Sequence, residues 1–293
     1  MPRFAANLTM LFNEVDFLDR FAAARRAGFR GVEYLFPYAY DPKVLAAKLA
    51  ENGLEQVLHN LPAGDWAKGE RGIACLPERV GEFREGVAKA IQYAKVLGCR
   101  QVNCLAGIPP ADADPRRVRA TFVENLRFAA GELGAEGIRL LVEPINTRDM
   151  PGFYLRRTEQ ALELISDAGS SNVYLQYDVY HMQIMEGDLV PTIERNLAHI
   201  AHVQIADNPG RNEPGTGEVN YPFLFDRLDA MGYRGWIGCE YKPKAGTVPG
   251  LGWFARYVAA KATREENRMS SGVVARSREG RPTSSSLDIP RGP

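Results

Sequence analysis

Four oxygen-bearing side chains each stand at the end of a short apolar run in this 293-residue chain: Glu143 after RLLV, Asp178 after VYLQY, Gln204 after IAHV and Glu240 after GWIGC. They are 35, 26 and 36 residues apart, and each interval is about the length of one strand and one helix. In a closed parallel barrel the carboxyl ends of all strands open on one face, so these side chains would converge. Three carboxylates and an amide oxygen form an anionic pocket that a divalent cation would neutralise.

The chemistry of this oxygen set selects the ion. An all-oxygen site with one neutral amide suits Mg²⁺ or Mn²⁺, whereas zinc would normally require more imidazole. Any single acid after a strand could simply cap the next helix or be solvated. Four of them in the same relative position favour a shared site at Glu143, Asp178, Gln204 and Glu240.

Two histidines occupy comparable positions. His181 follows Asp178 by three residues, and His59 ends an apolar run just before a long loop. A lone histidine is more often a hydrogen-bonded packing residue, but a place at a strand end favours contact with a substrate. His202, inside a strand, and His199, in the preceding helical stretch, are interpreted as structural.

Three cations lie on loops that follow strands: Arg71 in GERG, Arg211 in DNPGRN and Lys242 just beyond Glu240. Most such charges only solvate a surface. On these loops, however, a guanidinium or an ammonium could bind a substrate carboxylate or hydroxyl. Trp66, on the loop that carries Arg71, would either close over the pocket or anchor that loop to the barrel.

The elements that must position these residues come from a repeated unit. An amphipathic helical stretch, a glycine that can end it and a short β-rich run recur along the chain, with the glycine at Gly28, Gly53, Gly98, Gly169 and Gly232. The pattern yields eight candidate strands alternating with helices, the number that closes a (β/α)8 TIM barrel. An open doubly wound sheet is the alternative, but no GxGxxG follows the first strand.

Two stretches break the regular spacing. A loop of roughly twenty residues (PAGDWAKGERGIACLPERVGE) follows the third strand, and long ordered loops tend to be functional. We predict a barrel domain over 1–262 and a separate tail over 263–293. The tail is rich in Arg, Ser, Gly and Pro and poor in large apolar residues, so we expect it to be disordered.

Composition excludes several partners. Thirty-six basic residues balance thirty-six acidic ones, so no net field attracts nucleic acid or an anionic membrane. The amino terminus lacks a long apolar segment, so neither a signal peptide nor a membrane span is expected. Four cysteines without a CxxC pair are interpreted as packed or free thiols, which favours the cytoplasm. The expected partner is a small molecule.

Several segments resemble the hydroxypyruvate isomerase family within the xylose-isomerase-like TIM barrels. The resemblance runs from about Met1 to Tyr257 and includes GFRGVEYLFPY, LHNLPAGDWAKGERGIAC, QYDVYHMQ, HVQIADNPGRNEPGTGE and GCEYKP. It implies that Glu143 and Glu240 are the catalytic acid/base pair and that both, with Asp178 and Gln204, occupy the metal positions. Many relatives have histidine where this chain has Gln204, which leaves the identity of the metal open.

The resemblance further implies interconversion of hydroxypyruvate and 2-hydroxy-3-oxopropanoate, as part of glyoxylate metabolism and without an organic cofactor. Sister enzymes that isomerise four-carbon 2-oxotetronates or epimerise ketohexoses at C3 are alternatives with the same chemistry. A metal-dependent phosphodiesterase of the endonuclease IV type and a silent sugar-acid binder are alternatives of other classes. A homo-oligomer is compatible with the family, in which barrels often pair.

Overall fold

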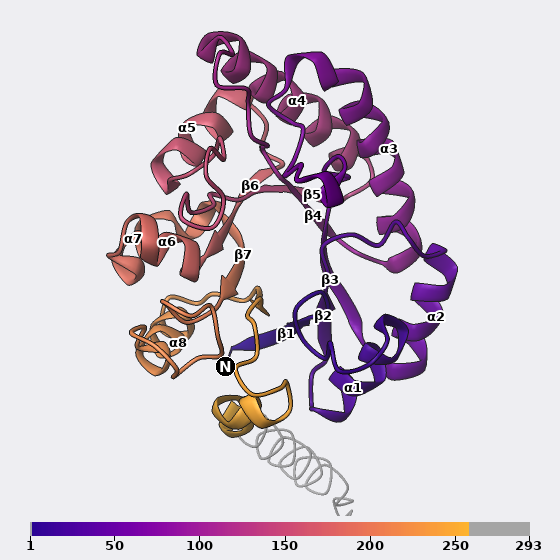
Figure 1. The fold of residues 1–293 in the computed structure, drawn as a ribbon, viewed down its shortest axis with the longest axis vertical. Helices are drawn as coiled ribbons and strands as arrows, with labels where there is room; N and C mark the ends of the chain where they lie inside the picture. The colour runs from indigo at the N-terminus through magenta and orange to yellow at the C-terminus, as the bar shows by residue number, and fades with distance from the viewer. Residues whose placement is uncertain (1, 258–293) are drawn as a thin grey trace, which may run out of the picture. The chain divides into compact units, whose positions relative to one another are not determined.

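Eight short strands form the centre of the structure, a computed structural model that describes residues 2–257. Each strand pairs in parallel with the next, and β1 also pairs with β8, so the sheet closes into a barrel within Pro2–Trp253 (Figure 1). The strands are β1 (Arg3–Asn7), β2 (Gly31–Glu33), β3 (Glu55–Asn60), β4 (Gln101–Cys104), β5 (Arg139–Val142), β6 (Val173–Asp178), β7 (Ile200–Ile205) and β8 (Trp236–Cys239). The predicted TIM barrel is confirmed, and the open sheet is excluded. The predicted boundary at 262 and the tail from 263 lie outside the described residues.

Helices surround this ring of strands (Figure 1). They are α1 (Arg20–Arg26), α2 (Pro42–Asn52), α3 (Val80–Leu97), α4 (Pro115–Ala135), α5 (Thr158–Ala168), α6 (Val179–Met185), α7 (Leu189–Asn196) and α8 (Tyr221–Ala230). Gly53, Gly98 and Gly169 follow α2, α3 and α5 at φ of 56°, 65° and 63°. This left-handed conformation ends a helix at little cost only for glycine, which explains the recurring glycine in the sequence. No helix among the described residues is both long enough and apolar enough to cross a membrane.

The strands place the four oxygen-bearing residues at one end of the barrel. Glu143 and Glu240 directly follow β5 and β8, Asp178 is the last residue of β6, and Gln204 lies one residue before the end of β7. Asp178 is in register with Gln204, and Gln204 with Gly238. All four side chains therefore lie within about two residues of the carboxyl ends of their strands.

The long loop after β3 is also present. It runs over residues 61–79 and contains two turns of 3₁₀ helix, Trp66–Lys68 and Pro77–Arg79. An isolated bridge between Gly72 and Ala106 ties it to the segment after β4. Gly72 has φ of 111°, and a Cβ there would lie 2.3 Å from the carbonyl oxygen of Leu105, so this tie requires glycine.

The four cysteines, Cys75, Cys99, Cys104 and Cys239, are free and buried. Burial raises the pKa of each thiol. A thiol in such surroundings stays protonated and unreactive. The four residues therefore act as small packing groups, as the sequence predicted.

Candidate active site

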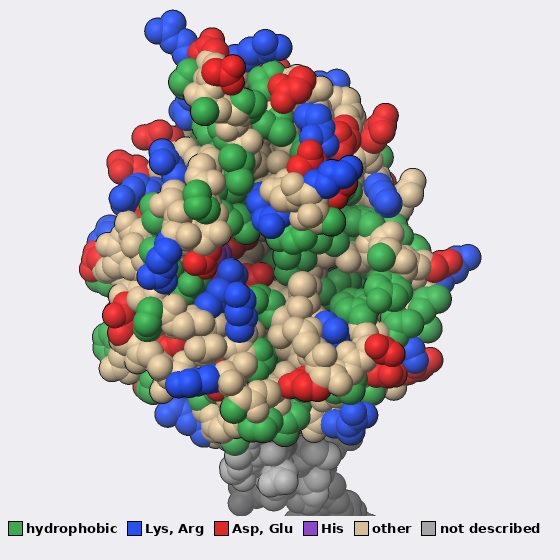
Figure 2. Space-filling view, viewed as in Figure 1, with side chains coloured by type: hydrophobic (Ala, Val, Ile, Leu, Met, Phe, Trp, Pro, Cys, Tyr) green, Lys and Arg blue, Asp and Glu red, His purple; other side chains and the backbone are tan. Residues whose placement is uncertain are grey.

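A cavity of about 710 Å³ opens at the carboxyl ends of the strands. Its polar lining includes Glu143, His181, Arg211, Glu240 and Lys242, and its apolar wall is formed by Met10, Leu35, Trp66, Leu105, Ile145, Met150 and Pro243. Figure 2 shows acidic and basic side chains meeting at a hollow near the centre of this view. A few polar groups set in an apolar wall are typical of a small-molecule site.

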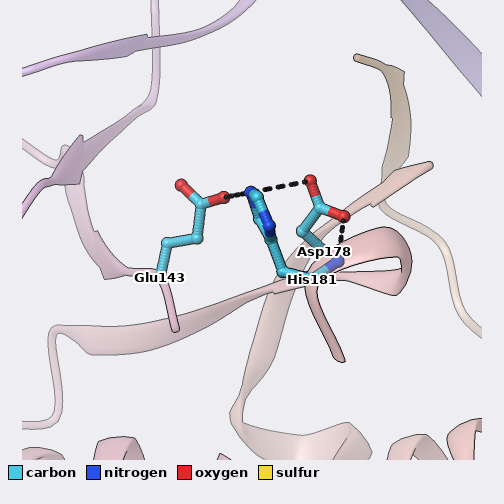
Figure 3. A group of neighbouring side chains, drawn as sticks. All are labelled: Glu143, Asp178 and His181. Carbon is cyan, nitrogen blue, oxygen red and sulfur yellow. Dashed lines mark hydrogen bonds and ion pairs between the residues drawn. The ribbon is translucent and has the colours of Figure 1, made fainter. Parts of the chain in front are cut away.

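Glu143, Asp178 and His181 form a buried cluster (Figure 3), and Glu143 and His181 line the cavity. The Nε2 atom of His181 lies 3.8 Å from Glu143 Oε1 and 3.8 Å from Asp178 Oδ2. One ligand atom from each residue falls within 4.8 Å of the others, so the spacing is that of a metal-binding group. Asp178 Oδ2 is buried and has no hydrogen-bond partner, although an ionised oxygen there requires a donor or a cation.

The start of α6 explains why Asp178 and His181 lie together. Asp178 caps the helix, because its Oδ1 accepts hydrogen bonds from the backbone N–H groups of Tyr180 (2.7 Å) and His181 (3.2 Å). The first turn of the helix then brings His181 back over the carboxylate. One cap therefore orders two side chains of the site.

The hydrogen bonds around His181 define its tautomer. Asn146 Nδ2 lies 2.6 Å from His181 Nδ1, while Asn146 Oδ1 accepts the backbone N–H of Asp149 at 2.7 Å. The amide therefore donates to Nδ1, and in the neutral ring the proton is on Nε2. Burial lowers the pKa of His181 to about 4, which keeps the ring neutral. Although the distances alone would allow His181 to bind a metal, this tautomer makes Nε2 a hydrogen-bond donor.

Two side-chain amides hold Glu143. Asn103 Nδ2 and Gln176 Nε2 both donate to Glu143 Oε2 at 2.9 Å. Oε1 is the oxygen that lies near His181. Burial, followed by the negative charges of Glu240 and Asp178, raises the pKa of Glu143 well above its usual range. The carboxyl group is thus fixed in position, and a raised pKa is typical of a general acid or base.

Glu240 lies beside a partly buried cation. Arg211 Nη2 is 3.3 Å from Glu240 Oε2, and Arg211 Nη1 is 3.9 Å from Asp149 Oδ2. The guanidinium also lies 5.2 Å from the centre of the Tyr180 ring. Burial raises the pKa of Glu240 to about 8 even though Arg211 opposes the shift, because the charge of Asp178 adds to it. Two buried carboxyl groups with raised pKa values therefore line one cavity.

The two cations of the rim come from separate loops that are joined by backbone contacts. The N–H of Lys242 donates to the carbonyl oxygen of Arg211 at 2.7 Å, and Asn212 Nδ2 donates to the carbonyl oxygen of Lys242 at 2.7 Å. Arg211 has φ of 55°, a left-handed conformation that these contacts stabilise. Lys242 is exposed and lines the cavity. The loops thus present two positive charges on the same side as Glu240.

Gln204, predicted to be a metal ligand, does not line the large cavity. It is buried near Glu143 and Glu240, where all three border a small inner recess. However, its Oε1 accepts a hydrogen bond from Gln176 at 2.6 Å, and its Nε2 donates to Glu33 at 2.8 Å. Both ends of the amide are therefore engaged within the protein.

His59 does not reach the cavity, contrary to the sequence-based expectation. Strand residues alternate in direction, and the next residue, Asn60, is the one that lines the cavity. The His59 ring is fully buried, with Tyr38 among its neighbours. Burial lowers its pKa to about 4. We therefore assign it no contact with a substrate.

Arg71 packs against Trp66 and does not itself line the cavity. Its guanidinium lies 4.1 Å from the centre of the Trp66 ring and donates to the carbonyl oxygens of Trp66 and Glu70 at 3.0 and 2.8 Å. Trp66 itself lines the cavity. The long loop thus contributes an aromatic wall, with Arg71 behind it.

Other polar residues of the site were missed from sequence, namely Glu33, Asn103, Asn146, Asp149 and Gln176. Asn103 and Gln176 are buried residues within strands, and Gln176 lies two residues before Asp178. Side chains two apart on a strand point to the same side. That spacing was the available signal for Gln176.

The chain matches the family model described as xylose isomerase-like TIM barrel over residues 21–257. It belongs to this family. Within the xylose isomerase-like barrels, hydroxypyruvate isomerase of Escherichia coli is 57% identical over 257 residues, which is 88% of this chain and 100% of that protein. The 2-oxo-tetronate isomerase of Cupriavidus necator is 53% identical over 88% of this chain and 99% of that protein. A crystal structure from Brucella melitensis, described as AP endonuclease, family 2, is 50% identical, with a TM-score of 0.86 over 88% of this chain and 99% of that one.

Proposed function

We propose that this protein is an isomerase that interconverts hydroxypyruvate and 2-hydroxy-3-oxopropanoate through an enediolate. The observation that carries the proposal is the pair Glu143 and Glu240, two buried carboxyl groups with raised pKa values on one cavity. A silent binder has no use for two such groups, whereas proton transfer at carbon requires an acid and a base. The high identity to a hydroxypyruvate isomerase gives independent support.

The reaction moves one proton between adjacent carbons. Hydroxypyruvate carries a hydroxymethyl group at C3, a carbonyl at C2 and a carboxylate at C1. A base removes a proton from C3, and the electron pair forms the C2–C3 double bond of an enediolate. A proton is then returned to C2, while the hydroxyl proton on the C3 oxygen is lost and the C2 oxygen gains one. One of the two glutamates serves as base and the other as acid, and the roles reverse with the direction of reaction.

The other residues bind and shield the substrate. Arg211 and Lys242 offer the positive charges for the substrate carboxylate. The Nε2–H of His181 points between Glu143 and Asp178 and can donate to a substrate oxygen. Trp66, with Arg71 stacked behind it, covers the cavity and restricts water near the enediolate.

The carboxylates also suit a divalent cation. The partnerless Asp178 Oδ2, together with Glu143 and Glu240, forms a buried anionic set that favours Mg²⁺ or Mn²⁺. Gln204 would join these ligands only by giving up the hydrogen bond from Gln176. A bound cation would stabilise the negative charge that develops on the enediolate oxygens.

Isomerisation of a four-carbon 2-oxotetronate is the second candidate. A relative with that name is 53% identical, and a cavity of about 710 Å³ is far larger than a three-carbon acid requires. The same pair of glutamates would perform the same proton transfer. We place the three-carbon substrate first because the relative of that name has the higher identity.

The test is an assay of the purified protein with each acid in parallel. Hydroxypyruvate and a 2-oxotetronate are supplied with Mg²⁺, with Mn²⁺ or with EDTA, and product formation is followed by NMR. Faster turnover of hydroxypyruvate supports the proposal, and turnover of 2-oxotetronate alone would favour the second candidate. No turnover of either acid, together with cleavage of an abasic-site DNA duplex, would favour a phosphodiesterase instead. The variant Lys242→Ala tests the binding role of Lys242, since an unchanged KM would rule that role out. Arg71→Ala tests the support that Arg71 gives to Trp66, since unchanged kcat and KM would rule that support out.

A further inference from the structure

A buried glutamate at the centre of the barrel does not line the large cavity but borders the inner recess that Glu143, Gln204 and Glu240 share. Glu33, the last residue of β2, is fully buried. Its Oε1 accepts from Asn7 Nδ2 at 3.1 Å and from Gln204 Nε2 at 2.8 Å, and its Oε2 lies 2.7 Å from His202 Nε2. The carboxylate thus joins β2 to β1 and β7. Burial of a carboxylate costs free energy, so we expect this group to have a function that explains it.

Space for the Glu33 side chain comes from β8, which flanks β1 on the side away from β2. A Cβ on Gly238 of β8 would lie 2.4 Å from both carboxylate oxygens of Glu33. No carbon atom can lie so close to these oxygens, so only glycine fits at this position. The absence of a side chain at Gly238 therefore allows Glu33 to reach the donors on β7.

Glu33 determines which way the Gln204 amide faces. A carboxylate surrounded by N–H groups only accepts, so Gln204 must present its NH₂ group to Glu33 and its oxygen to the other side. On that side the oxygen accepts from Gln176 Nε2 at 2.6 Å. The same Nε2 group donates to Glu143 Oε2 at 2.9 Å. The direction of the hydrogen bonds is thus passed from Glu33 to Glu143.

We propose that Glu33 is a positioning residue for Glu143. It orients the chain Glu33, Gln204, Gln176, Glu143, so that two amide donors hold Oε2 and Oε1 remains toward His181. Without an acceptor at Glu33, the Gln204 amide can reverse and turn its NH₂ group toward that of Gln176. The Gln176 amide then loses its acceptor, and the hold on Glu143 weakens.

Steady-state kinetics test this role. The kinetic test rests on the proposed function, because it measures isomerisation. Glu33→Met removes the acceptor at similar size, and Glu33→Gln keeps an oxygen for Gln204 while His202 changes tautomer. For Glu33→Met we expect kcat to fall by about 10- to 100-fold, as is typical when a supporting partner is lost, with little change in KM. Glu33→Gln should retain most of the activity. A wild-type kcat in Glu33→Met would overturn the proposal.

Two further variants separate positioning from folding. Asn172→Leu removes the bonds from Asn172 Nδ2 to the carbonyl oxygens of Ala130 and Ile138, ahead of β6 and away from the cavity, and should lower Tm without lowering kcat. If Glu33→Met does not fold, Glu33→Asp keeps the charge but withdraws the acceptor from Gln204, and the same loss of kcat is expected. An unchanged kcat there would overturn the role.

A structural measurement keeps this inference distinct from the proposed function. The side-chain amide signals of Gln176 and Gln204 can be followed by ¹⁵N NMR after selective labelling. We expect both to shift in Glu33→Met and to stay near their wild-type positions in Asn172→Leu. Unchanged signals in Glu33→Met would overturn the inference, whereas a wild-type protein without isomerase activity would overturn only the proposed function.

Discussion

Arg211 Nη2 lies 3.3 Å from Glu240 Oε2 at the rim of the barrel cavity. The guanidinium favours the ionised carboxylate and so limits the rise in the pKa of Glu240 that burial produces. We therefore expect Arg211 to have two effects. It favours the ionised form of Glu240, and it offers a positive charge to the substrate carboxylate.

The variant Arg211→Met should change both binding and pH dependence. Loss of a hydrogen bond to a charged group costs about 1.5–3 kcal/mol, so KM for hydroxypyruvate should rise about tenfold to hundredfold. Without the cation the pKa of Glu240 rises further, and the acid limb of the kcat/KM profile should move to higher pH. Arg211→Lys, which keeps the charge, is the control for the pH effect. If the acid limb of the kcat/KM profile stayed at the same pH in Arg211→Met, Arg211 would have no effect on the pKa of Glu240.

Glu240 should lower the free energy of unfolding near neutral pH when no divalent cation is bound. Its pKa is higher in the folded than in the unfolded chain, where it is about 4.3. Such a group stabilises folding below its unfolded pKa, and this contribution is lost as pH rises through the folded value of about 8. Glu240→Gln should therefore raise Tm at pH 8 in EDTA, by about 2–4 °C for each kcal/mol recovered. Thermal melts at pH 5 and pH 8 test this, since equal differences at both pH values would contradict it.

A divalent cation should stabilise the folded chain through the same acids. At a concentration 100-fold above its Kd, a ligand adds about 2.7 kcal/mol, so saturating Mn²⁺ or Mg²⁺ should raise Tm and EDTA should reverse the rise. Asp178→Asn is a matched test, because the amide oxygen can still cap α6 while the charge near Glu143 is lost. We expect the variant to fold and to lose the cation-dependent increase in Tm. An undiminished increase would place the cation elsewhere.

The two histidines that sequence placed at the site should respond differently to substitution. His59→Leu should leave kcat and KM unchanged, because the ring is buried away from the cavity. His181→Leu should lower kcat about 100-fold or more, since it removes a hydrogen-bond donor beside Glu143. Steady-state kinetics of both variants decide this, and a loss of activity in His59→Leu would contradict the placement.

Much of this arrangement could be predicted from sequence because it depends on local periodicity. Glu143, Asp178 and Glu240 end apolar runs, and a strand end in a parallel barrel defines a position on one face. His181 follows from helical spacing after Asp178. The expected contact of His59 with a substrate is not supported, because a strand end fixes how far along the barrel a residue lies but not which way its side chain points. Successive residues of β3 point to opposite sides, and Asn60 is the one that lines the cavity.

The inner hydrogen-bond network could not be predicted in the same way. Glu33 lies in the apolar run GVEYLF, and its partners Asn7, His202 and Gln204 come from β1 and β7, up to 171 residues away. Their contact depends on closure of the barrel and on the missing side chain at Gly238. For the same reason the sequence predicted Gln204 as a metal ligand without indicating that both ends of its amide bond to Gln176 and Glu33.

Proton transfer by Glu143 and Glu240 is the central step of the proposed reaction. Its most direct test is the turnover of hydroxypyruvate by Glu143→Gln and Glu240→Gln, which keep the size of each side chain and remove its acid/base function. We expect each variant to fold as the wild type does and to lose about 100- to 10,000-fold in kcat, the usual contribution of a general acid or base. Wild-type kcat in either variant would contradict the role of these two residues.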